Sequence, residues 1–180
     1  MPAEFMAGDQ RFAARRPDVL VYQTQPLNEP VTLVGPIEAE LHVSTSGTDS
    51  DFIVKLIDVY PPDAADPEPN PTAARMGNYQ QLVRGEVMRA KFRNSLERPE
   101  PMTPDEPTVL KFTLPDVYHT ALPGHRLMVQ VPISWLHPVD RNPQTHVDIY
   151  HAVESDYQSA VERVYRSPAR PSRLSARRMP

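Results

Sequence analysis

The sequence contains no cysteine, only six glycines and only three lysines, and each scarcity excludes a class of site. Without cysteine there is no disulfide scaffold and no thiolate metal site. No two glycines lie two or four residues apart, so a dinucleotide-binding fingerprint and the strained elbow of a nucleophilic serine are both missing. No lysine follows a glycine as it does in a phosphate-binding P-loop.

Long hydrophobic runs are also missing. No apolar stretch approaches the ~20 residues that a membrane-spanning helix needs, and nothing resembles a signal peptide. The formal net charge of −4 provides no field that would attract nucleic acid. Six arginines follow Glu162 without an acid among them, and aromatic residues are not interleaved beyond Tyr165, which favours a solvated or docking tail. We therefore expect neither a nucleic-acid partner nor a membrane partner.

Proline is abundant, with 22 among 180 residues, against a usual share of ~5%. Because proline does not fit inside helices or central strands, this abundance predicts short elements joined by turns. Most apolar residues recur with a period of two, as in Ile37–Val43, where they alternate with polar residues. The strands that we expect are Val19–Tyr22, Ile37–Val43, Phe52–Tyr60, Leu82–Phe92, Thr108–Leu114, His125–Trp135 and His146–Val153. A short helix near the C-terminus is predicted for Glu154–Tyr165, from apolar residues spaced by three and four.

These elements predict an all-β fold. Seven or so short strands separated by turn-rich loops favour a sandwich of two antiparallel sheets, and the long loops suit a jelly roll better than a meander. The length fits one domain spanning residues 1–180, with residues 1–8 and 175–180 as loose ends.

The stretch SWLHPVDRNPQT, residues 134–145, offers two interpretations. Ser134, His137 and Asp140 have the chemistry of a catalytic triad, but a triad gathers its members from separate elements around a pocket with an oxyanion hole. The alternative is a proline-bounded loop, in which Asp140 and Asn142 bond backbone amides and Arg141 pairs with a carboxylate from elsewhere. We favour the loop, as a structural element first and a docking surface second.

Two pairs of residues have a spacing that could suit a metal ion. Asp49 and Asp51, two residues apart, could hold calcium together with Asp58, although hydrogen bonding at a turn or strand edge is the simpler use of such residues. His146 and Asp148 are also two apart, but a zinc site needs further soft or imidazole ligands. We therefore expect no metal, no cofactor and no catalytic residue in this chain.

Several long blocks resemble a known family. The block from Asp9 to Pro61, which begins DQRFAARRPDVLVYQTQPLNEP, resembles the C-terminal domain shared by Xaa-Pro dipeptidyl-peptidases and cocaine esterase-like hydrolases. The later blocks MGNYQQLVRGEVMRAKFRNSLERPEP, LPDVYHTALPGHRLMVQVPISWLHPVDRNPQT and YRSPARPSRL resemble the branch of α-amino-acid ester hydrolases and glutaryl-7-aminocephalosporanic acid acylases.

The resemblance implies a jelly roll of the galactose-binding type that supports an upstream α/β-hydrolase domain of the same protein, shapes the entrance of its active site and contributes to oligomer contacts. The parent would be a serine hydrolase acting on ester or amide bonds, whose triad has no counterpart here. The ester-hydrolase branch includes exported enzymes, which leaves both a periplasmic or secreted parent and a cytoplasmic one open. Alternatives are a free-standing carbohydrate-binding module, or a hydrolase domain on a separate chain after processing. The domain-docking loop is predicted to consist of Trp135, His137, Asp140, Arg141 and Asn142, since tryptophan and arginine often anchor interfaces.

Overall fold

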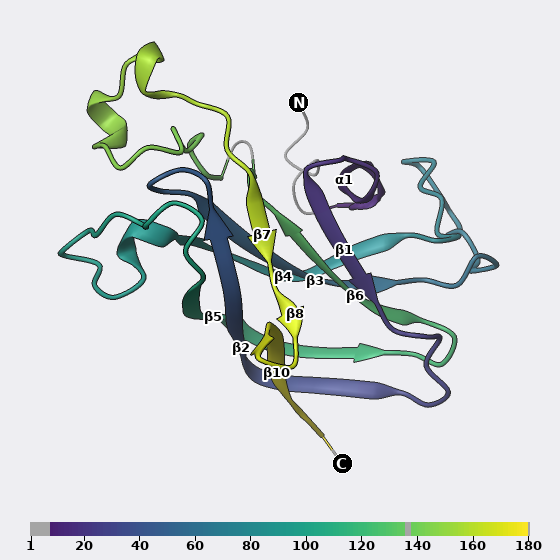
Figure 1. The fold of residues 1–180 in the computed structure, drawn as a ribbon. Coiled ribbons are helices and arrows are strands. Elements are labelled where there is room, and N and C mark those ends of the chain that lie inside the picture. Colours follow the sequence, from purple (N-terminus) through teal and green to yellow (C-terminus); the bar gives the residue numbers. More distant parts are fainter. Residues whose placement is uncertain (1–7, 136–137, 180) are drawn as a thin grey trace.

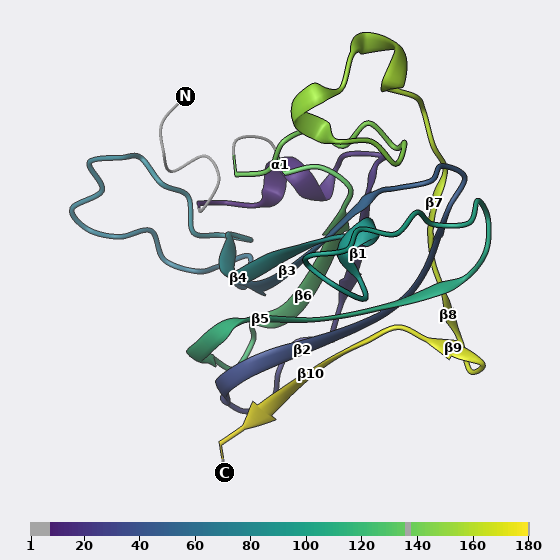
Figure 2. The ribbon, with the colours of Figure 1, turned by 90° about the vertical axis from the view of Figure 1, so that its left-hand side faces the viewer.

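The protein is a sandwich of two antiparallel sheets in a computed structural model that describes residues 8–135 and 138–179 (Figures 1 and 2). Sheet A has the strand order β1-β6-β3-β4, formed by Val19–Gln23, Arg126–Pro132, Asp51–Val59 and Gln80–Arg89. Sheet B has the order β10-β2-β5, formed by Arg173–Arg178, Val31–Thr45 and Thr108–Ala121. β7 (Glu162–Val164) pairs with the end of β2, and β8 (Arg166–Ser167) pairs with β9 (Arg170–Pro171).

The strand order accounts for the long loops, from which the sequence predicted a jelly roll rather than a meander. The chain passes from β2 in sheet B to β3 and β4 in sheet A, returns to sheet B with β5, and enters sheet A again with β6. Strands that are neighbours in a sheet, such as β2 and β5, are therefore distant in sequence, whereas in a meander neighbouring strands follow one another along the chain. The predicted all-β sandwich is confirmed.

The main core lies between the two sheets and follows the period-two pattern. Ile37, Ala39, Leu41 and Val43 of β2 are all nearly inaccessible to solvent, while the alternating residues of this strand are more exposed. They pack against side chains of sheet A, among them Phe52, Val54 and Leu56, in one cluster. Alternation places every second side chain on the same face, so the pattern alone identified which face is buried.

β3 departs from this pattern because both of its faces are covered. All nine of its residues are buried. The outer face of sheet A is covered by the N-terminal segment around α1 (Arg11–Ala14), in which Gln10 and Ala13 are buried. This second layer explains why both faces of β3 carry apolar residues, while its three charged residues, Asp51, Lys55 and Asp58, each have a hydrogen-bond partner. None of the helices in the described residues is long and apolar enough to cross a membrane.

The prediction of a helix over Glu154–Tyr165 is wrong. This segment forms one 3₁₀ turn at Glu154–Asp156 and then becomes extended, because β7 pairs with the end of β2. The backbone N–H of Val153 donates to Asp156 Oδ2 at 2.8 Å, which holds the turn. Pairing with a sheet outweighs a weak helical spacing of apolar residues.

Two further predictions about the C-terminal third need correction. His146–Val153 is not a strand but contains a 3₁₀ turn at Ile149–His151, in which the backbone N–H of Tyr150 donates to the Asp148 carboxylate. This stretch belongs to the segment between β6 and β7 that projects beyond the sheets (Figures 1 and 2). Residues 175–178 are not a loose end, since β10 pairs with β2 as far as Arg178.

Candidate functional site

The predicted docking loop lies at one end of the sandwich, beside the turn between β2 and β3. Thr48 of that turn donates its backbone N–H to the carbonyl oxygen of Gln144 at 3.1 Å. Its hydroxyl accepts the backbone N–H of His146 at 2.8 Å. A side chain at Gly47 could not fit, because its Cβ would lie 2.2 Å from the Gln144 carbonyl oxygen. The loop and the turn are therefore fitted closely to each other.

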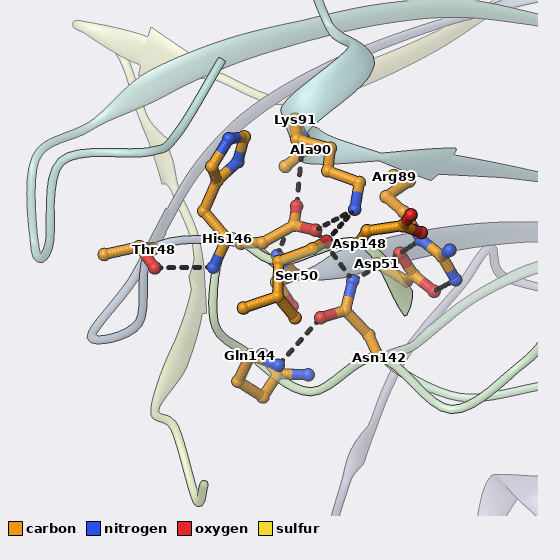
Figure 3. A network of polar contacts seen from close by, with 12 residues as sticks. Thr48, Ser50, Asp51, Arg89, Ala90, Lys91, Asn142, Gln144, His146 and Asp148 are labelled. Atoms are coloured by element: carbon orange, nitrogen blue, oxygen red, sulfur yellow. Dashed lines mark hydrogen bonds and ion pairs between the residues drawn. The ribbon is translucent and has the colours of Figure 1, made fainter. Parts of the chain in front are cut away.

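Asn142 anchors the loop in the protein interior (Figure 3). Its side chain is 6% exposed and donates to Asp51 Oδ1 at 2.8 Å and to Asp49 Oδ2 at 3.3 Å. Its own oxygen accepts the backbone N–H of Gln144 at 2.8 Å. The side-chain N–H groups and the side-chain oxygen of Asn142 are thus all hydrogen-bonded, and they link the loop to β3 and to the β2–β3 turn. The prediction that Asn142 is a loop-forming residue is confirmed, although its partners are carboxylates as well as an amide.

Two cations from the end of β4 and the adjoining turn neutralise these carboxylates. Arg89 donates to both oxygens of Asp51, at 2.8 and 2.9 Å, in the bidentate geometry that suits a guanidinium. Lys91 Nζ lies 3.7 Å from Asp49 Oδ2 and donates to the carbonyl oxygen of Val147 at 2.7 Å. Burial raises the pKa of Asp49, which the backbone N–H and charge of Lys91 partly offset. Asp49 and Asp51 therefore serve hydrogen bonding here.

Glu162, at the start of β7, adds a third acid to this end of the sandwich. Its Oε1 accepts the Thr45 hydroxyl at 3.0 Å, whereas its Oε2 is shielded from solvent and has no hydrogen-bond partner among the described residues. Burial raises the pKa of Glu162 to about 7, and the charges of Asp49 and Asp51 act in the same direction. The hydroxyls of Ser50 and Thr45 act in the opposite direction but do not outweigh burial, so the carboxylate favours the protonated form.

Trp135 lies on the outer face of sheet A. The Lys55 ammonium is 4.5 Å from the centre of its ring, within the range of a cation–π contact. A Cβ at Gly85 would lie 2.8 Å from the same ring, so glycine is required below it. Lys55 is 2% exposed and donates to Gln10 Oε1 at 3.0 Å. Burial, assisted by the charge of Arg16, lowers the pKa of Lys55 to about 8.

The other predicted loop residues have separate surroundings. Asp140 is exposed, and its backbone oxygen accepts from Arg89 Nη2 at 3.3 Å. Arg141 lies over the ring of Tyr157, 4.9 Å from its centre, rather than beside the carboxylate that was expected. His137 lies outside the described residues.

The triad hypothesis for this stretch finds no support in the position of Ser134. Its hydroxyl accepts a hydrogen bond from Arg16 Nη2 at 3.2 Å. Arg16 also pairs with Asp18, in the segment before β1. The serine oxygen therefore faces a guanidinium, which is not a base that could take its proton.

A second polar cluster, which the sequence did not reveal, lies at the opposite end of β3. Asp58 is 1% exposed and accepts from His119 Nε2 and His125 Nδ1, each at 2.8 Å. The Tyr60 ring packs 4.5 Å from the His125 ring. These residues join β3 of sheet A to β5 of sheet B. No local spacing could have indicated them, because the histidines follow Asp58 by 61 and 67 residues.

Neither cluster has the arrangement of a metal centre. Within residues 8–135 and 138–179, no group of three or more histidine, cysteine, aspartate or glutamate side chains could hold a metal ion. In the Asp58 cluster both carboxylate oxygens already accept from imidazoles, and in the Asn142 network they accept from an amide, a guanidinium and backbone amides. Both clusters are suited to fixing the position of chain segments.

A shallow apolar recess of about 330 Å³ adjoins the loop. Its lining combines β4, the turn after it and the loop itself, through Val87, Met88, Phe92, Leu96 and Val139. Leu96 is 81% exposed at its rim. We call the recess with its rim the docking face. It is accessible and mostly apolar, although Arg89 and Asp140 also line it, and through Arg89 it adjoins the Asn142 network.

Comparisons with known proteins agree on one family. The model of the X-Pro dipeptidyl-peptidase C-terminal non-catalytic domain matches residues 4–175. Cocaine esterase from Rhodococcus sp. (strain MB1 Bresler) is 34% identical over 166 residues, which cover 92% of this chain and 26% of that protein.

Solved structures extend this similarity to the fold. An aminopeptidase from a marine sediment archaeon, Thaumarchaeota archaeon, superposes with a TM-score of 0.90 at 41% identity. An α-amino acid ester hydrolase superposes with a TM-score of 0.89 at 44% identity. Each match covers 97% of this chain and 28% of the other, so the chain spans little more than a quarter of the relatives' length.

Proposed function

This chain belongs to the family of X-Pro dipeptidyl-peptidase C-terminal non-catalytic domains, and on that premise we propose that it supports the α/β-hydrolase domain of a serine hydrolase. The substrate bonds of that enzyme would be esters or amides, as the names of its relatives indicate: a cocaine esterase, an aminopeptidase and an α-amino acid ester hydrolase. In this role the sandwich binds the catalytic domain and helps to shape the entrance of the active site.

The observation that carries the proposal is the docking face beside the Asn142 network. An exposed apolar recess is a common mark of a protein contact. Its floor is β4, and its rim includes Val139 of a loop that Asn142 fixes to two buried carboxylates. A surface whose backbone is held in this way loses little conformational entropy on binding, which favours association.

A carbohydrate-binding role has less support. Binding of sugars by a sandwich commonly uses an exposed aromatic platform, and Trp135 is the only tryptophan in the sequence. Its ring lies against Lys55 and above Gly85, so this face of the indole is taken up by the protein itself.

The proposal is tested by placing a charge on the docking face in the full-length protein. Leu96→Glu changes an exposed side chain, so the sandwich itself should fold normally. We expect the variant to release the sandwich from the hydrolase domain. Limited proteolysis should then cut between the domains at least about tenfold faster, as the loss of ~1.4 kcal/mol of contact energy would give.

The matched control is Leu122→Glu, since Leu122 is 52% exposed and lies at the opposite end of the sandwich, after β5. Trp135→Ala, which removes the ring beneath the loop, should act in the same direction as Leu96→Glu and leave the catalytic triad intact. Equal proteolysis of Leu96→Glu, Leu122→Glu and the wild type, with unchanged ester hydrolysis, would mean that the docking face contacts nothing.

A further inference from the structure

β7 and the residues before it are held to the sandwich at one end of β2 (Figure 1). β7 has three residues, which pair with residues 43–45 of β2. Beside this pairing, the backbone N–H of Ser46 donates to the carbonyl oxygen of Val161 at 3.1 Å. The backbone N–H of Val161 donates to the Ser46 hydroxyl at 2.9 Å. We call β7 together with residues 158–161 the latch, because so short an element can detach while the two sheets stay folded.

The latch also holds the loop that carries Asn142. The backbone N–H of Gln158 donates to the carbonyl oxygen of Pro143 at 3.1 Å, and its side-chain Nε2 donates to the carbonyl oxygen of Gln144 at 3.2 Å. The backbone N–H of Gln144 is in turn bonded to the side-chain oxygen of Asn142. Detachment of the latch would therefore take two hydrogen bonds from the loop beside the docking face.

Glu162 is the residue at which the latch meets the buried charges of the Asn142 network. Its Oε1 accepts the hydroxyl of Thr45, the residue with which it pairs between β7 and β2. Arg89 and Lys91, the two cations of the network, are each paired with one of its aspartates. Within residues 8–135 and 138–179, no cation forms an ion pair with Glu162. An ionised Glu162 in the closed latch would therefore lie beside two other acids without a cation of its own.

The groups around Glu162 determine when it ionises. Burial raises the pKa of Glu162 to about 7, the charges of Asp49 and Asp51 act in the same direction, and the hydroxyls of Ser50 and Thr45 oppose them. The charged and titratable side chains at this end of the sandwich are Asp49 and Asp51 on the β2–β3 turn and β3, Arg89 and Lys91 at the end of β4 and after it, His146 between β6 and β7, and the surface pair of Arg163 with Asp105.

We propose that the proton on Glu162 keeps the latch closed, and that ionisation of its carboxylate releases β7 and residues 158–161 from β2. A buried charge without a partner is costly, and outward movement of the latch hydrates it. In the open latch Glu162 has the ordinary pKa of an exposed carboxyl, so the open form binds fewer protons and gains population as the pH rises from 4.5 to 7. The latch goes beyond the proposed function, because it is a property of the sandwich itself and requires no bound catalytic domain.

Hydrogen exchange between pH 5 and 8 measures the latch directly. The reporters are the amides of Ser46, Gln158 and Val161, each of which donates a bond that the open latch lacks. After correction for the intrinsic pH dependence of chemical exchange, their opening equilibrium should rise at least about tenfold between pH 5 and 8.

Low concentrations of urea distinguish local from global opening. Local detachment exposes little surface, so urea should hardly accelerate exchange of the three reporter amides. Amides of β3, all of whose residues are buried, exchange through global unfolding and should respond strongly to urea.

Two variants isolate the proton. Glu162→Gln keeps an oxygen that can accept from Thr45 but cannot ionise, so the opening of its latch should not depend on pH. Glu154→Gln, at an exposed acid of the same segment, should retain the wild-type rise. A difference between these two variants assigns the rise to Glu162.

Three results would overturn the proposal. The first is a wild-type latch that opens equally at pH 5 and 8, and the second is a rise that persists in Glu162→Gln. The third is a response of the reporter amides to urea as strong as that of β3, which would mean that only global unfolding exposes them. The two proposals remain separable: a pH-dependent latch with no effect of Leu96→Glu on interdomain proteolysis refutes only the docking face, and the reverse pattern refutes only the latch.

Discussion

Asn142→Ala is the change that most directly probes how the loop is held. The substitution removes two donors from buried carboxylates, at 2.8 Å from Asp51 and 3.3 Å from Asp49, together with the acceptor of the Gln144 amide. Hydrogen bonds to charged groups contribute about 1.5–3 kcal/mol and neutral ones about 1 kcal/mol. The longer bond to Asp49 is the weaker one, and Arg89 and Lys91 still compensate both carboxylates. We therefore expect the free energy of unfolding to fall by about 3 kcal/mol.

Urea denaturation measures this loss. At a slope of ~2 kcal/mol per molar urea, the midpoint should fall by ~1.5 M. Trp135, as the single tryptophan, reports on the loop by fluorescence, while far-UV circular dichroism reports on the sheets, and coincident transitions would justify a two-state treatment. The matched control is Asn94→Ala, at an exposed asparagine, which should change stability by less than ~0.5 kcal/mol. If Asn142→Ala were as stable as this control, the network would not be what holds the loop.

Two predictions concern pH. The pKa of Glu162 is raised from 4.5 to about 7, so the folded protein binds more protons than the unfolded chain between these values, and the free energy of unfolding should fall as the pH rises from 4.5 to 7. Glu162→Gln should flatten that fall in denaturation curves recorded across this range, and an unchanged slope would contradict the assignment. The pKa of Lys55 is lowered from 10.5 to about 8, so the folded protein binds fewer protons there and stability should rise between pH 8 and 10.5. Lys55→Met should abolish that rise, whereas Lys111→Met, at a lysine whose side chain is 70% exposed, should leave it in place.

The sheets could be predicted from the sequence because their signal is local. Alternation in Ile37–Val43 identified the buried face of β2, and the apolar residues on both faces of β3 reflect the cover that α1 and its neighbours place on the outer face of sheet A. Both predictions for the segment from His146 to Tyr165, a strand and then a helix, were wrong. Its structure depends on long-range contacts, such as the bond from Lys91 to Val147 and the pairing of β7 with β2, which no window of sequence contains.

The loop could be recognised from the sequence, whereas the contacts that hold it could not. Asp140 and Asn142 were predicted to be loop formers from their residue types and the surrounding prolines, and the side-chain oxygen of Asn142 does accept a backbone amide. The partners of Asn142 could not be recognised, since Asp51 and Asp49 precede it by 91 and 93 residues. The Asp58 cluster could not be predicted for the same reason: it joins strands of two sheets, which become neighbours only when the sandwich forms.

The charges of the Asn142 network indicate what it contributes to the fold. Asp49, Asp51 and Glu162 face two cations, Arg89 and Lys91, so the cluster is neutral when one acid keeps its proton. Glu162, whose pKa burial raises to about 7, is the acid that fits this requirement. Placing three buried and two half-buried ionisable groups together is a poor way to gain stability, because desolvation consumes most of the attraction between them. It is an effective way to exclude alternatives, since any shift of the loop would take the Asn142 donors away from two buried carboxylates. An end of the sandwich specified in this way presents the docking face in one geometry, which is what a domain that supports an active-site entrance requires.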